Sequence, residues 1–139
     1  MIISHNGMLL EGAEVLGQTL RAADDDSLWA VWELDNCAVG ATVETGRARP
    51  FLRLCPSVQI PRRLCRGDEL GRFLFYAEDE RMARLRVDPD DGEVTLVRDL
   101  AGLDRGELEA ALVEELGFLD DVACPCLAQW VSEKLGLDS

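Results

Sequence analysis

The stretch Gly67–Leu100, GDELGRFLFYAEDERMARLRVDPDDGEVTLVRDL, contains one helix pattern, two strand patterns and a tight turn in an unbroken run. Its first part has apolar residues at i, i+3, i+4 and i+7, the spacing of one helix face: Leu70, Phe73, Leu74 and Ala77. Asp68 and Glu69 place negative charge in the first turn, where the helix dipole favours it. The sequence therefore predicts a helix that begins near Asp68.

The period of the pattern changes from that of a helix to that of a strand after this segment. Ala83, Leu85 and Val87 alternate with charged residues, which is typical of a strand with one buried face. Pro89-Asp90-Asp91-Gly92 follows, where proline fixes φ and glycine supplies a positive φ, and Val94 and Leu96 then resume the alternation. A helix that leads into a β-hairpin is thus the predicted centre of the fold.

The segments before this centre predict one helix and three strands. Residues 7–22 place Leu9, Ala13, Leu16 and Leu20 on one face, as in an amphipathic helix. Residues 28–34, 37–45 and 50–55 have strand composition, with Asp35-Asn36 as turn residues between the first two. We expect these three strands to form an antiparallel meander.

Residues 102–137 have a helical pattern up to Gly136, a suitable stop. Asp104 and Glu107 have the spacing of a capping box at its start. Pro125 lacks the backbone donor that a helix interior needs and clashes with the preceding turn. The segment is therefore either one kinked helix or two helices, the second beginning near Pro125.

Length and composition limit the class of protein. The 139 residues, 47% hydrophobic and 29% charged, suit a single domain over residues 1–139 with its own core. The net charge of −13 repels phosphate backbones, so nucleic-acid binding by bulk charge is not expected. The chain shows no signal-peptide pattern and no apolar run that could span a membrane, so we expect a cytoplasmic protein without membrane contact.

The positive charge is concentrated in one segment. Residues 47–66 hold six arginines and no acidic residue: Arg47, Arg49, Arg53, Arg62, Arg63 and Arg66. These arginines either neutralise acidic neighbours such as Asp24–Asp26, or form a patch that binds an acidic peptide, a second subunit or a phosphorylated ligand. On the second reading, Arg62, Arg63 and Arg66, just before the central helix, are candidate partner-binding residues.

Two tryptophans raise the question of what covers the second face of the sheet. Trp29 and Trp32 are three residues apart, so in a strand they point to opposite faces. One enters the core, and the other is covered by a helix of the same subunit, by a partner or by a second subunit. Trp29 and Trp32 are therefore both candidate partner-binding residues, and Val97 poses the same question because it lies opposite Val94 and Leu96.

The residue types that carry catalysis or bind metals occur without a supporting pattern. Five cysteines, an odd number, predict free thiols. The pair Cys124-Pro125-Cys126 has too short a spacer for zinc, and the only histidine, His5, is remote. Neither the Rossmann nor the P-loop fingerprint occurs, and no serine lies in a Gly-flanked nucleophile turn. We therefore expect no catalytic residue, no metal and no cofactor.

The predicted order is α-β-β-β-α-β-β-α, an α+β fold with a five-stranded antiparallel sheet and helices packed on one face. This order resembles the YbjN family and the fold of the type III secretion chaperones. The resemblance is carried by residues 67–119: the helix GDELGRFLFYAEDE, the strand RMARLRVD, the turn PDDG, the strand EVTLVRDL and the segment GLDRGELEAALVEEL.

The resemblance implies a protein without enzymatic activity that forms a homodimer and binds a protein client, as a chaperone or regulator. The alternative is a regulator that binds an anionic ligand or nucleic acid through the arginine-rich segment 47–66.

Overall fold

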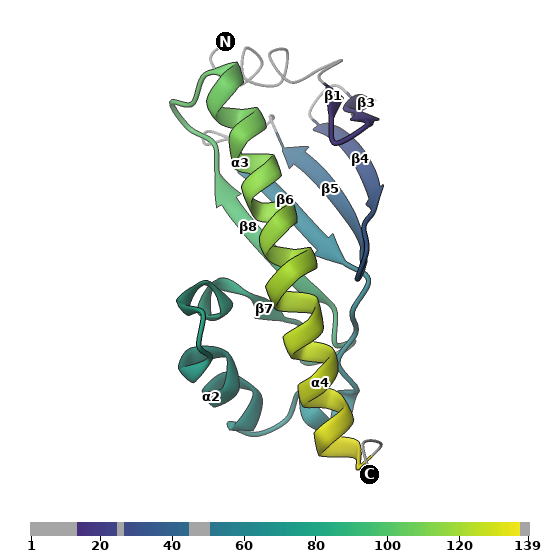
Figure 1. Ribbon diagram of the computed structural model, residues 1–139, viewed down its shortest axis with the longest axis vertical. Helices are drawn as coiled ribbons and strands as arrows, with labels where there is room; N and C mark the ends of the chain where they lie inside the picture. Colours follow the sequence, from purple (N-terminus) through teal and green to yellow (C-terminus); the bar gives the residue numbers. More distant parts are fainter. Residues whose placement is uncertain (1–13, 25–26, 45–50, 137–139) are drawn as a thin grey trace.

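The computed structural model describes residues 14–24, 27–44 and 51–136. They form an α+β fold in which one long helix crosses one face of an antiparallel sheet (Figure 1). The predicted five strands are present, and a short edge strand joins them. In sheet order they are β3 (Arg21–Asp24), β4 (Ser27–Glu33), β5 (Ala38–Glu44), β6 (Phe51–Pro56), β8 (Val94–Asp99) and β7 (Arg86–Val87).

The predicted N-terminal helix is wrong where the structure describes it. Residues 14–22 form β1 (Glu14–Val15), β2 (Gln18–Thr19) and the start of β3, whereas residues 7–13 lie outside the described residues. Leu16 and Gly17 have φ of 48° and 82°, and positive φ at both turn positions is the geometry of a two-residue β-hairpin turn. Leu16 is therefore exposed, while Val15 and Leu20 are buried.

The meander and the later hairpin follow the predicted alternation. The predicted strands 28–34, 37–45 and 50–55 appear as β4, β5 and β6, and in β4 every second side chain is exposed from Trp29 to Glu33. The turn before β8 is also confirmed, because Gly92 N donates to Asp88 O (2.8 Å) and Asp88 N donates to Glu93 O (2.9 Å).

The central helix α2 (Glu69–Tyr76) is confirmed, with Leu70 and Leu74 buried. The strand after it is shorter than predicted, because residues 80–84 form the 3-10 helix η2 (Glu80–Arg84) and β7 has only two residues. The side chain of Asp79 accepts a hydrogen bond from Arg81 N (2.9 Å) at the start of η2, a local bond that favours the helical turn over a strand. A second 3-10 helix, η1 (Arg62–Leu64), precedes α2.

The C-terminal segment is one continuous helix, which decides between the two predicted alternatives. It comprises α3 (Arg105–Phe118), a π-helical turn η3 (Leu119–Ala123) and α4 (Cys124–Leu135), with right-handed helical dihedral angles at both junctions. The predicted capping box is present, since Glu107 N donates to Asp104 Oδ1 (2.9 Å) and Asp104 N donates to Glu107 Oε1 (3.4 Å). Gly136 ends the helix at φ 68°.

The π turn explains how the helix passes Pro125. Cys124 N donates to Leu119 O, five residues back, so this N–H does not reach the carbonyl of Asp120. Pro125 has no N–H to offer either. Asn36, in the β4–β5 turn, fills the gap: its Nδ2 donates to Asp120 O (2.9 Å) and its N to Asp120 Oδ1 (2.7 Å). The helix and the β4–β5 turn are thereby joined.

The hydrophobic core lies between the long helix and the inner face of the sheet. Trp32 is fully buried there, and its indole Nε1 donates to Val15 O (2.7 Å). The helix contributes buried leucines along its whole length: Leu108, Leu112, Leu116, Leu119 and Leu127. Among the described residues, no helix has the length and apolar character needed to cross a membrane.

Candidate protein-binding surfaces

The outer face of the sheet carries a row of side chains away from the core. The pairings of Trp29 with Thr42, Thr42 with Arg53 and Arg53 with Val97 align these four residues across β4, β5, β6 and β8. Trp29, Val97 and the neighbouring Val31 are each close to half exposed. This face therefore combines apolar side chains with a guanidinium group.

The two tryptophans are separated as the strand period predicts. Trp29 is 45% exposed on the outer face, whereas Trp32 is 1% exposed in the core. Trp32 cannot contact a partner in the folded chain, so its assignment as a partner-binding residue is wrong. Trp29 remains a candidate contact residue.

The structure divides the arginine segment. Arg53 lies on the sheet, with its guanidinium 5.5 Å from the centre of the Phe51 ring. Arg62, Arg63 and Arg66 are exposed in and after η1. None of these three forms an ion pair with another described residue. Arg47 and Arg49, and the acidic residues Asp25 and Asp26, lie outside the described residues, so pairing with the acidic run stays a prediction.

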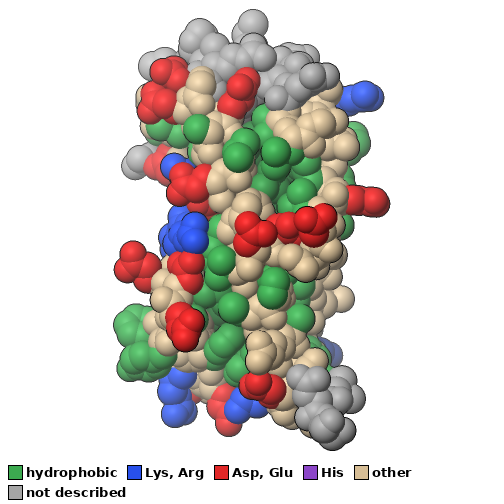
Figure 2. Space-filling model, in the orientation of Figure 1, with side chains coloured by type: hydrophobic (Ala, Val, Ile, Leu, Met, Phe, Trp, Pro, Cys, Tyr) green, Lys and Arg blue, Asp and Glu red, His purple; other side chains and the backbone are tan. Residues whose placement is uncertain are grey.

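The outer side of α2 carries the most exposed aromatic side chains of the described chain. Phe75 is 69% and Tyr76 is 77% exposed, and their rings meet edge to face at 5.0 Å. Figure 2 shows hydrophobic side chains protruding at the edge that α2 occupies in Figure 1. Beside them lies a shallow hollow of about 390 Å³, lined by Gly67, Asp68, Gly71, Arg72, Phe75 and Tyr76.

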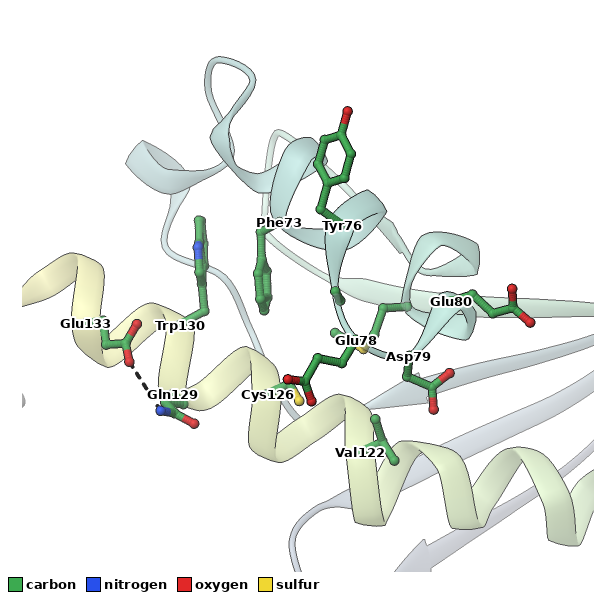
Figure 3. Close-up of a pocket in the computed structure, with 12 residues that line it drawn as sticks. Phe73, Tyr76, Glu78, Asp79, Glu80, Val122, Cys126, Gln129, Trp130 and Glu133 are labelled. Atoms are coloured by element: carbon green, nitrogen blue, oxygen red, sulfur yellow. Dashed lines mark hydrogen bonds between the residues drawn. The ribbon is translucent and has the colours of Figure 1, made fainter.

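The other side of α2 faces α4 across an open groove of about 1060 Å³. Phe73 on α2 and Trp130 on α4 stack at one end of it, with ring centres 5.2 Å apart and planes 9° from parallel (Figure 3). Ala77 and Val122, both half-buried, add apolar surface to the groove wall. The groove is open to solvent and its volume is at the upper end of the range for small-molecule pockets, so it has room for a stretch of polypeptide.

Acidic side chains lie along this groove. Glu78 extends from the end of α2 toward the long helix, and Glu133 lies on α4, where Gln129 Nε2 donates to its Oε1 (3.2 Å). Neither glutamate has a basic partner among the described residues. The adjacent Asp79 is paired with Arg81 at 2.7 Å, which lowers the pKa of Asp79 to about 2.

The five cysteines are free thiols, and they differ in access. Cys37 and Cys124 are buried, and burial raises the pKa of both thiols. Burial also raises the pKa of the half-buried Cys55 and Cys65. Cys126 is exposed and lines the groove. Among the described residues, no group of three histidine, cysteine or acidic side chains is arranged to hold a metal ion.

The buried carboxylate Glu115 belongs to an ion cluster between helix and sheet. Its Oε1 lies 3.2 Å from Arg84 and 3.3 Å from Arg98, which come from η2 and β8. Its Oε2 has no hydrogen-bond partner among the described groups. The cluster lies apart from the residues that line the groove and connects α3 to two other elements, so we assign it a structural role.

These features define an α+β domain with an antiparallel sheet and a helix layer on one face. Its exposed candidate surfaces are the outer face of the sheet, the arginines in and after η1, the outer side of α2 and the groove. No protein-family model, no curated protein and no solved structure matches this chain. The resemblance to the YbjN family and to the secretion chaperones therefore depends on the sequence pattern alone and stays a prediction.

Sequence reasoning missed the aromatic side of α2 and the groove. The sequence does contain a signal for the aromatic side: Phe75 and Tyr76 are two aromatic residues on the polar side of an amphipathic helix. They lie outside its apolar stripe, which consists of Leu70, Phe73, Leu74 and Ala77. The groove had no such signal, because it forms between residues that are about fifty positions apart in the chain.

Proposed function

We propose that this chain is a non-enzymatic protein-interaction module, chaperone-like or regulatory, that binds a protein client as a homodimer. The observation that carries the proposal is the pair of exposed aromatic side chains on α2 beside a hollow of the same helix. The buried carboxylates support a non-enzymatic role, because Glu115 and Asp120 bond to structural partners on other elements.

The aromatic pair and the hollow suit a two-fold symmetric contact between two copies. Phe75 and Gly71 are four residues apart, one helical turn, on the outer side of α2. When two α2 helices pack antiparallel, Phe75 of each copy enters the hollow at Gly71 of the other, as a self-complementary interface requires. Each aromatic side chain removed from water contributes on the order of 1.5–3 kcal/mol.

Gly71 provides a sharp test, because a Cβ atom added there would meet no atom within 4 Å in the single chain. Gly71→Gln fills the hollow and also improves helix propensity by roughly 1 kcal/mol. We expect this variant to be a monomer by light scattering, with a fold at least as stable as the parent protein. The parent should show about twice the 15.4 kDa mass of one chain.

Two controls make this test specific. Val113→Gln, at an exposed position of α3, should leave the dimer intact. Trp29→Ser tests the outer sheet face as the alternative interface. A parent protein of monomer mass would refute the homodimer. If Gly71→Gln is still a dimer and Trp29→Ser is a monomer, the interface lies on the sheet instead.

A second candidate function is the binding of an anionic ligand, favoured by the lack of ion pairs at Arg62, Arg63 and Arg66 among the described residues. If these arginines bind an acidic partner, changing all three to Glu leaves the melting temperature nearly unchanged and abolishes binding of a poly-glutamate peptide. Arg86→Glu, at an exposed arginine of β7 outside residues 47–66, is the control. Undiminished peptide binding would reject this function, and binding to DNA that falls steeply with salt would favour nucleic acid.

A further inference from the structure

The groove between α2 and α4 combines two properties that together specify a ligand. Its wall is apolar and aromatic, with the half-buried Phe73, Ala77 and Val122 available to a large apolar side chain. Its acidic groups come from both sides, Glu78 just after the end of α2 and Glu133 on α4. A ligand that fills the groove therefore lies near two carboxylates.

The two carboxylates are exposed and are free to pair with a cation from outside the described chain. The nearest basic side chains are already engaged: Arg81 pairs with Asp79 at 2.7 Å, and Lys134 pairs with Glu69 at 3.2 Å. Glu78 and Glu133 have no such partner among the described residues, and Glu80 points away from the space between the helices (Figure 3). The groove thus keeps negative charge over an apolar wall.

We infer that this groove binds a cationic apolar segment of the protein client, in which lysine or arginine residues flank a large apolar side chain. The apolar side chain packs near Phe73 and Val122, and the flanking cations pair with Glu78 and Glu133. The inference depends on the proposed client-binding function and names the chemistry of the client. An acidic segment is excluded by the same charges, as complementarity at an interface requires.

The test uses a fluorescein-labelled peptide of leucine, tryptophan and arginine, with a matched peptide that has glutamate in place of arginine. Fluorescence polarisation should show binding of the first peptide only, and added salt should weaken it because the carboxylates are exposed. Glu78→Lys/Glu133→Lys should bind about tenfold or more weakly. Glu33→Lys/Glu44→Lys changes the net charge equally on the outer face of the sheet and should bind as the parent does.

Cys126 supplies an independent readout of where the peptide binds. It is the exposed thiol among the five and lines the groove, so iodoacetamide should modify it first. The arginine peptide should slow this reaction several-fold, as measured by mass spectrometry of the modified site. If the lysine variant is misfolded by circular dichroism, Glu78→Gln/Glu133→Gln removes the same charges and should also weaken binding.

Four results would overturn the inference: no binding of the arginine peptide, equal binding by the Glu78→Lys/Glu133→Lys variant, tighter binding of the glutamate peptide, or unchanged alkylation of Cys126. The groove lies within one subunit, which separates this inference from the homodimer. A monomer that binds the peptide at Cys126 refutes only the dimer. A dimer that fails to bind it refutes only the groove.

Discussion

Asn36 is expected to stabilise the long helix at the point where Pro125 interrupts its hydrogen bonds. The carbonyl of Asp120 receives no helical N–H, because Cys124 N is bonded to Leu119 O and Pro125 has none. Asn36 Nδ2 donates to this carbonyl at 2.9 Å. Asn36→Ala removes that donor while keeping the backbone bond from residue 36 to Asp120 Oδ1.

The magnitude follows from one lost hydrogen bond and one carbonyl without a donor. A net hydrogen bond is worth about 0.5–1.5 kcal/mol, and an unsatisfied buried acceptor costs about 1–3 kcal/mol. Because the bond is only partly buried, water replaces some of it, and we expect Asn36→Ala to lower the free energy of unfolding by about 1–2 kcal/mol. Urea unfolding monitored by circular dichroism measures this, with Asp35→Ala at the adjacent exposed turn position as the control.

Pro125→Ala tests whether the missing N–H of Pro125 is the reason that the Asp120 carbonyl depends on Asn36. The new N–H at position 125 lies five residues after Asp120, the spacing of a π-helical bond, so it can donate to the same carbonyl. In that background Asn36→Ala should cost less, with a coupling of about 0.5 kcal/mol or more in the double-mutant cycle. Equal costs in the two backgrounds would refute the reasoning, as would an Asn36→Ala variant as stable as the Asp35→Ala control.

Two further substitutions test the packing of the hairpin and the ion cluster. Gly92→Ala should lower the free energy of unfolding in urea by about 2 kcal/mol or more, because its Cβ would lie 1.8 Å from Ile60 O in addition to the strain of φ 75°. Gly102→Ala, with φ 80° and nothing within 4 Å of its Cβ, should cost only about 1–2 kcal/mol. Equal costs for the two variants would contradict the clash. Glu115→Leu should change the free energy of unfolding little, because the two arginines it leaves unpaired reach solvent. Arg84→Ala/Arg98→Ala should cost about 3 kcal/mol, because it leaves the buried Glu115 carboxylate unpaired. A larger cost for Glu115→Leu than for the double variant in the same assay would contradict this account.

The parts of the fold that the sequence predicted are those governed by local periodicity. In β4, alternation alone assigned Trp29 and Trp32 to opposite faces, and the hydrophobic pattern of Leu70 and Leu74 gave α2 its buried side. The Asp104–Glu107 capping box is likewise a local bond between residues three apart. Each of these features is decided by residues within one or two turns of the chain.

The predictions that were wrong or open depended on a competing local bond or on distant residues. Leu16 and Leu20 fit a helical stripe, but Gly17 favours the positive φ of a turn, and Leu20 is buried in the core as part of a β-structure. Whether Pro125 would divide the C-terminal helix depended on Asn36, which is 84 residues from Asp120 in sequence. The pattern around Pro125 carries no trace of that donor.

The two proposed contacts share α2, so the choice of residue decides whether they can be tested separately. Phe73 points toward Trp130 and lines only the groove, whereas Phe75 and Gly71 line only the outer hollow. Tyr76 lines both, so its substitution would affect the dimer and the groove together and could not assign either one. Gly71→Gln should therefore dissociate the dimer without loss of peptide binding, and Glu78→Lys/Glu133→Lys should lose peptide binding without dissociation. If each variant instead lost both properties, the two surfaces would have to be one continuous interface around α2.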